Sequence, residues 1–137
     1  MLAFWLIPFS LGMPLIAATG GCTGADPALT HAALQTVTRA GALKHYVVEV
    51  TVKNVGNRAQ PSNLLQSVEV LQNGDHVDQK GLPPLRPGQS ATVTYAFDRA
   101  ASAGARTTRL TFVLSQTVAI PGPQDCSTAN DRIRLSV

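Results

Sequence analysis

The sequence predicts an all-β fold, an antiparallel β-sandwich of about seven short strands that follows an N-terminal signal segment. Apolar residues alternate with polar ones along several segments, turn sequences separate these segments, and one uncharged apolar run precedes them all. The length of 137 residues allows one buried core and is short for two ordinary domains. With 45% hydrophobic and 14% charged residues, the composition excludes an intrinsically disordered chain or a nucleic-acid tail.

The N-terminal segment, residues 1–18, has no ionisable side chain and runs into small residues, as a signal peptide does before its cleavage site. A transmembrane anchor is the competing interpretation. However, Pro8, Gly12 and Pro14 interrupt the run, which barely reaches the roughly 20 residues that span a bilayer. We therefore expect residues 1–21 to be a signal peptide, with a lipoprotein type of signal as the alternative, and residues 22–137 to be the mature domain. The protein would be exported to the periplasm, the cell envelope or the medium, and would meet a membrane only through its signal or a lipid anchor.

The two cysteines leave three outcomes open. In an exported protein, Cys22 and Cys126 predict one disulfide. Cys22 also stands where a lipoprotein signal places its acylated cysteine, although Thr19 is a poor match to the usual residue at that position. Cleavage after Ala25 would remove Cys22 altogether. A disulfide would close a loop of about 100 residues and contribute roughly 4 to 5 kcal/mol in the chain-entropy model.

Period-2 alternation predicts five clear strands, each with one face toward the core. All four aromatic residues of the mature part have inward parity, which removes the exposed rings on which sugar-binding and nucleic-acid-binding surfaces stack their ligands. The residues expected to point inward are Tyr46, Val48, Val50 and Val52 in 46–53; Val68 and Val70 in 67–70; Ala91, Val93, Tyr95 and Phe97 in 90–97; Leu110, Phe112 and Leu114 in 108–114; and Ile133, Leu135 and Val137 in 132–137.

Turn sequences separate these strands. Asn73-Gly74 favours a type I′ hairpin, because that turn needs positive φ at both central residues. Arg86-Pro87-Gly88-Gln89 has proline and glycine where a type II turn needs them. Only residues 28–42 and 100–105 have a helix-like composition, and neither shows a long apolar stripe at helical spacing.

Several segments together carry a family resemblance. They are Asp26-Pro27-Ala28-Leu29, VEVTVKNVGN at 48–57, the strand that ends in Asn73-Gly74, GLPPLRPGQSATVTYAF at 81–97, and Asn130 before RIRLSV. They resemble the CARDB domain, an immunoglobulin-like module of exported bacterial and archaeal proteins, over about residues 26–137. The most specific parts are the strand end at 52–57 and the turn at 85–90.

The resemblance implies a seven-stranded immunoglobulin-like sandwich without catalytic residues, used as an adhesive, spacer or accessory module. The chain departs from the family at Ser115-Gln116, where the usual acidic residues are missing, which puts a calcium-dependent role there in doubt. In an immunoglobulin-like sandwich the first strand can run parallel to the last, with their starts at one pole. Cys22 and Cys126 precede these strands, so a bridge is reachable if their Cα atoms lie within ~7 Å.

Residues with catalytic or metal-binding potential are few. His31, His45 and His76 are far apart, and each is expected at the surface or a strand edge. The cluster Asp75-His76-Val77-Asp78 is better explained as a polar hairpin arm, because alternate strand residues diverge instead of converging on one ion. The sequence contains no GxSxG, HExxH or P-loop pattern. We expect no enzyme activity, no cofactor and no metal.

Basic residues supply one candidate binding surface. The net charge is +3, and Arg109, Arg132 and Arg134 share the outward parity of the last two strands. They could form a stripe for an anionic partner. The competing interpretation is a solvated sheet face whose arginines protect an edge strand from pairing.

The connection 115–130 is the other candidate, because it is longer than most loops. Its residues Val118, Ile120, Pro121 and Pro123 would form a partner-binding loop, or else an irregular extra edge strand.

From these observations we expect a noncatalytic, exported, immunoglobulin-like module that acts in protein or cell-surface interaction, with an adhesive, accessory or structural role at the envelope. The partner would be a protein or a cell-surface polymer and not a nucleic acid. A carbohydrate-binding module is the alternative, and two exposed, coplanar aromatic rings would favour it. No oligomeric state follows from the sequence.

Overall fold

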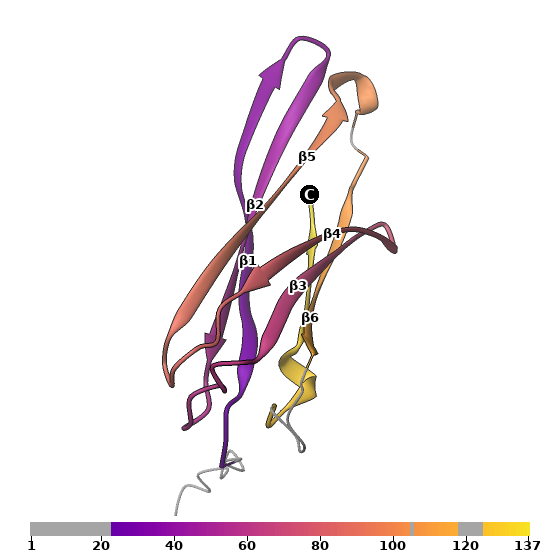
Figure 1. The fold of residues 1–137 in the computed structure, drawn as a ribbon. Coiled ribbons are helices and arrows are strands. Elements are labelled where there is room, and N and C mark those ends of the chain that lie inside the picture. The colour runs from indigo at the N-terminus through magenta and orange to yellow at the C-terminus, as the bar shows by residue number, and fades with distance from the viewer. Residues whose placement is uncertain (1–22, 105, 118–124) are drawn as a thin grey trace, which may run out of the picture.

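Seven strands form two antiparallel sheets in the computed structural model, which describes residues 23–104, 106–117 and 125–137 (Figure 1). Sheet A has the order β1-β2-β5, and sheet B has the order β4-β3-β6-β7. This arrangement confirms the predicted all-β sandwich. The strands are β1 (Pro27–Ala40), β2 (Leu43–Asn54), β3 (Leu65–Gln72), β4 (Asp75–Leu82), β5 (Ser90–Ala100), β6 (Arg109–Thr117) and β7 (Arg132–Ser136).

Two short 3-10 turns, η1 (Ala101–Ala103) and η2 (Thr128–Asn130), complete the elements of the described residues. None of the helical segments in this part of the chain is long and apolar enough to cross a membrane. The expected signal segment 1–21 and Cys22 lie outside the described residues.

The core lies between the two sheets and is filled by the residues that alternation placed there. Tyr46, Tyr95, Phe97 and Phe112 are at most 8% exposed, so the predicted inward parity of all four rings is confirmed. Three of these rings form one stack, with centroids 5.0 Å apart for Tyr46 and Phe97 and 5.8 Å apart for Tyr95 and Phe97. The apolar residues of β7 are half-buried and pack against this core from its margin.

Strand β1 occupies most of the segment whose composition is helix-like. It pairs with β2 along its whole length, with register shifts between Leu29 and His31 and between Leu34 and Thr36. Without an apolar stripe at helical spacing, a helix here would have no face to bury, whereas the long edge of β2 offers a complete ladder of backbone hydrogen bonds. Tertiary pairing therefore decides the conformation of this segment.

Both predicted turns have the expected backbone. Asn73 and Gly74 have φ of 50° and 90°, as a type I′ turn requires, and they join β3 to β4. Gly88 has φ of 76°, and the N–H of Gln89 donates to the carbonyl of Arg86 at 2.9 Å, as in a type II turn.

The side chain of Asn54, at the end of β2, is fully buried and organises the pole where the described chain begins. Its Oδ1 accepts from the backbone N–H groups of Asp26 and Gly56, each at 3.0 Å. Its Nδ2 donates to the carbonyls of Arg58 at 2.8 Å and Leu85 at 3.1 Å. One side chain thus joins the start of β1 to the loops that follow β2 and β4.

Candidate functional site

The three arginines singled out in the sequence lie on the outer face of sheet B. Arg134 pairs with Thr111, and Arg109 pairs with Ser136, in the antiparallel ladder of β6 and β7. Arg132 is two residues before Arg134 on β7, and all three arginines are exposed. The structure therefore brings them onto one surface, and their role in binding stays a prediction.

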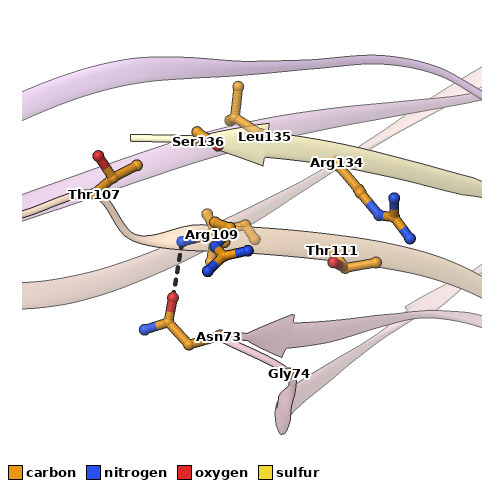
Figure 2. Close-up of a pocket in the computed structure, with 9 residues that line it drawn as sticks. Asn73, Gly74, Thr107, Arg109, Thr111, Arg134, Leu135 and Ser136 are labelled. Atoms are coloured by element: carbon orange, nitrogen blue, oxygen red, sulfur yellow. Dashed lines mark hydrogen bonds between the residues drawn. The ribbon is translucent and has the colours of Figure 1, made fainter.

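A hollow of about 690 Å³ opens beside two of these arginines (Figure 2). The β3–β4 turn forms one side of it, because the backbone N–H of Arg109 donates to Oδ1 of Asn73 at 3.0 Å and the N–H of Asn73 donates back to the carbonyl of Arg109 at 2.8 Å. Strands β6 and β7 form its base. The lining residues are Asn73, Gly74, Thr107, Arg109, Leu110, Thr111, Arg134, Leu135 and Ser136.

The arginines of this face have no acidic partner within ion-pair distance among the described residues. The two ion pairs of that part of the chain lie elsewhere, between His45 and Asp98 at 2.7 Å and between Lys80 and Asp78 at 3.1 Å. Within the described residues, no ion pair therefore engages the arginines on the outer face of sheet B.

A second cluster, which the sequence reasoning missed, lies at the pole where β1 and β7 begin. Asp125 and Asp131 are hydrogen-bonded to each other through their carboxyl groups, close to Asp26. Burial, together with the hydrogen bond and the charge of the neighbouring Asp131, raises the pKa of Asp125 to about 8. Burial also raises the pKa of Asp131. A proton shared by the pair explains how two carboxyl groups come together here.

Asn130 completes this cluster. Its Nδ2 donates to Oδ1 of Asp26 at 3.0 Å, while its own Oδ1, like Oδ1 of Asp131, is buried without a hydrogen-bond partner in the described structure. Asp26 and Asn130 stand 104 positions apart in the sequence, just before β1 and β7. Only the parallel alignment of β1 and β7, visible in Figure 1 as the indigo and yellow strands that rise from the same pole, brings them together.

The same pole holds Cys126, whose backbone N–H donates to the carbonyl of Ala25 at 3.0 Å. This contact places Cys126 beside the chain three residues after Cys22, as the expected disulfide requires. Cys22 itself lies outside the described residues, so the disulfide and its acylated alternative stay predictions. The candidate partner loop with Val118, Ile120, Pro121 and Pro123 also falls outside the described residues.

The histidines are dispersed, as expected. His31 lies on the edge strand β1 and His76 on β4, both exposed, and Nδ1 of His45 contacts Oδ1 of Asp98 at 2.7 Å. In the hairpin arm 75–78, a hydrogen bond from the backbone N–H of Gln79 is the main cause that lowers the pKa of Asp78.

Comparison with known proteins gives a family and a fold. The sequence profile of the CARDB family matches residues 26–120. None of the curated proteins compared with the chain matches it. The chain is similar to the crystal structure of a CARDB domain from Pyrococcus furiosus, solved in complex with di-metal ions, with a TM-score of 0.60 and 19% identity over 85% of this chain and 94% of that one. A protein from Archaeoglobus fulgidus matches with a TM-score of 0.35 and 12% identity over 80% of this chain and 94% of that one.

The di-metal ions of the Pyrococcus domain raise the question of whether this chain offers a similar centre. Among residues 23–104, 106–117 and 125–137, no group of three or more His, Cys, Asp or Glu side chains is arranged to hold a metal ion. At the aspartate pole the carboxyl groups bond to one another, and Asn130 binds Asp26. Among the described residues, Oδ1 of Asn130 and Oδ1 of Asp131 are buried side-chain oxygens without a hydrogen-bond partner.

Proposed function

The chain belongs to the CARDB family, and on that premise we propose that it is a noncatalytic module of the cell envelope that contacts a protein or a surface polymer through the outer face of sheet B. Members of this family resemble immunoglobulin domains, which bind through loops, sheet faces and edges and carry no reaction centre of their own. The apolar, uncharged N-terminal segment supports the export that this proposal needs.

One observation carries the proposal. Arg109, Arg132 and Arg134 are exposed on one sheet face, beside a hollow, without an acidic partner among the described residues. A surface that serves only solubility normally mixes charges of both signs. A face on which three arginines outnumber the one glutamate, Glu69, is instead complementary to an anionic surface, and arginine is enriched in protein interfaces.

The alternative, a carbohydrate-binding module with an aromatic platform, has less support. Tyr46 and Phe97 are close to coplanar, at 8°, but they are 5% and 8% exposed and stack on each other inside the core. No ring of the described residues is therefore offered to a sugar.

The proposal is tested by binding of the purified, fluorescently labelled mature chain to whole cells and envelope fragments of the source organism. We expect saturable binding that weakens at least fivefold when Arg132 on the arginine face is reversed in Arg132→Glu. The matched control is Arg58→Glu, which makes the same charge change at an exposed position in the loop after β2. Absence of saturable binding, or equal loss in both variants, would refute a role for this face.

A further inference from the structure

We infer that the hollow between Arg109 and Arg134 binds the phosphate or sulfate group of a linear anionic polymer, and that Arg132 contacts the next such group along it. The inference rests on the proposed function and names the chemistry of its partner.

The donors around the hollow suit a tetrahedral oxyanion. The guanidinium groups of Arg109 and Arg134 stand on the outer face of sheet B, as Figure 2 shows, with Thr111 in the adjoining β6 position. Guanidinium forks bind phosphate and sulfate through two parallel hydrogen bonds. Thr107, Thr111 and Ser136 line the same hollow and add hydroxyl groups that can donate to the remaining oxygens.

Asn73 adds a donor with a fixed orientation. Its Oδ1 already accepts from the backbone N–H of Arg109, so its NH₂ is the end of the amide that is left for a ligand. The turn that carries Asn73 is held by its left-handed backbone and by two hydrogen bonds to Arg109. The site therefore has a preformed wall, which reduces the entropy lost on binding.

The spacing of the arginines suits a repeating ligand. Because Arg109 pairs with Ser136, it is a diagonal neighbour of Arg134 across the β6–β7 ladder, at about 7 to 8 Å between backbone positions. Arg132 and Arg134 are two residues apart on one strand, which corresponds to roughly 7 Å. The three arginines thus form a bent row with nearly even steps, first across the ladder and then along β7, which a linear polyanion can follow and a single small anion cannot.

Acidic residues lie near both ends of this row, but not in the hollow. None of the residues that line the hollow is acidic. In the register of sheet B, Arg132 pairs with Val113 and Val113 pairs with Glu69, so Glu69 lies two strands, or roughly 10 Å, from Arg132. Asp75 pairs with Gln72 and Gln72 pairs with Leu110, so Asp75 lies two strands, or roughly 10 Å, from the neighbour of Arg109; it forms no ion pair with either arginine within the described part. The first anionic group is therefore expected in the hollow itself.

The test uses the folded mature chain and three immobilised polymers: polyphosphate, dextran sulfate and neutral dextran. We expect binding to polyphosphate or dextran sulfate, none to dextran, and a marked loss between 50 and 300 mM salt, roughly as counterion screening of exposed charges predicts. Binding to only one of the two polyanions identifies the group that the site prefers.

Two double variants locate the site. Arg109→Ala with Arg134→Ala should weaken polyanion binding at least tenfold, whereas Arg58→Ala with Arg86→Ala, which removes the same charge from exposed loop positions, should weaken it less than threefold. Arg109→Lys with Arg134→Lys keeps the charge and loses the planar fork, so an intermediate loss is expected. If the double alanine variant does not fold, the double lysine variant tests the site in its place.

Equal losses of polyanion binding in the two double alanine variants would show that only net charge matters and would overturn the inference. Binding to neutral dextran as strong as binding to the polyanions, or no binding to either polyanion, would also overturn it. Cell binding that depends on Arg132 but is not competed by either polyanion would overturn the inference and leave the proposed function standing. Absence of cell binding together with specific polyanion binding would overturn the proposed function and leave the inference about the hollow standing.

Discussion

Nδ2 of Asn130 donates a hydrogen bond to Oδ1 of Asp26 at 3.0 Å, across 104 positions of the sequence. The bond joins the start of β1 to the turn that precedes β7, and it brings Asp26 against the carboxyl groups of Asp125 and Asp131. The segments that precede β1 and β7 are therefore fastened to each other by polar side chains.

The first prediction concerns pH. The pKa of Asp125 rises from 3.8 to about 8 on folding, so between these values the folded chain keeps a proton that the unfolded chain has lost. The free energy of unfolding should then fall as the pH rises from about 4 to about 8. One group gives at most ~1.4 kcal/mol per pH unit, and less here because it is only partly shielded from solvent.

Urea unfolding at pH 5, 6.5 and 8 measures this slope. Asp125→Asn, which cannot lose a proton, should reduce it, and Asp75→Asn, at an exposed turn position, should leave it unchanged. A stability that increases with pH across this range would contradict the shared proton.

The second prediction concerns Asn54. Asn54→Ala would leave the N–H groups of Asp26 and Gly56 and the carbonyls of Arg58 and Leu85 without their partner. We expect a loss of roughly 3 kcal/mol or more in the free energy of unfolding, because buried backbone groups without partners are costly. Thermal and urea unfolding measure it.

Asn57→Ala is the matched control. Asn57 is exposed, and its side chain accepts one bond, from the N–H of Gly24 at 2.9 Å. The expected loss is about 1 kcal/mol. Similar losses for the two substitutions would mean that Asn54 does not organise the pole.

The third prediction concerns Gly56. A Cβ at this position would contact the carbonyl oxygen of Gly24 and would lie 2.6 Å from the backbone nitrogen of Asp26. Both contacts are with backbone that is itself held in place, so Gly56→Ala should cost about 1 to 3 kcal/mol. Gly81→Ala, where a Cβ meets no atom within 4 Å, should change stability by less than about 0.5 kcal/mol. A neutral Gly56→Ala would show that segment 24–26 can move away.

The fourth prediction concerns Cys126, beside Ala25 at the same pole. The intact mass of the exported protein should be two hydrogens below that of the reduced mature chain. Cys126→Ser should then lower the free energy of unfolding by up to roughly 4 to 5 kcal/mol, the value that the chain-entropy model gives for a loop of this length. A mass that includes acyl chains on Cys22, or one that begins at Asp26, would contradict the disulfide.

Alternation by itself determined the central strands and the core. In β2 and β6, each second residue from Val48 to Val52 and from Leu110 to Leu114 is buried, because a pleated strand between solvent and core imposes period 2 directly on the sequence. The sequence also predicted the turn at Asn73-Gly74, because few residue types adopt the positive φ that this turn needs. The same parity placed Arg109, Arg132 and Arg134 on one face.

The tertiary structure alone decided what lies between distant segments. Residues 28–40 form a strand because β2 offers an edge to pair with. The hollow beside Arg109 exists because the Asn73 turn is hydrogen-bonded to β6. The aspartate pole forms because β1 and β7 are aligned in parallel. The period of the sequence shows to which face of its sheet each side chain points. It does not show which other strand will pair with the strand that carries the residue. Groups that meet across 104 residues, such as Asp26 and Asn130, therefore become visible only when the strands are paired.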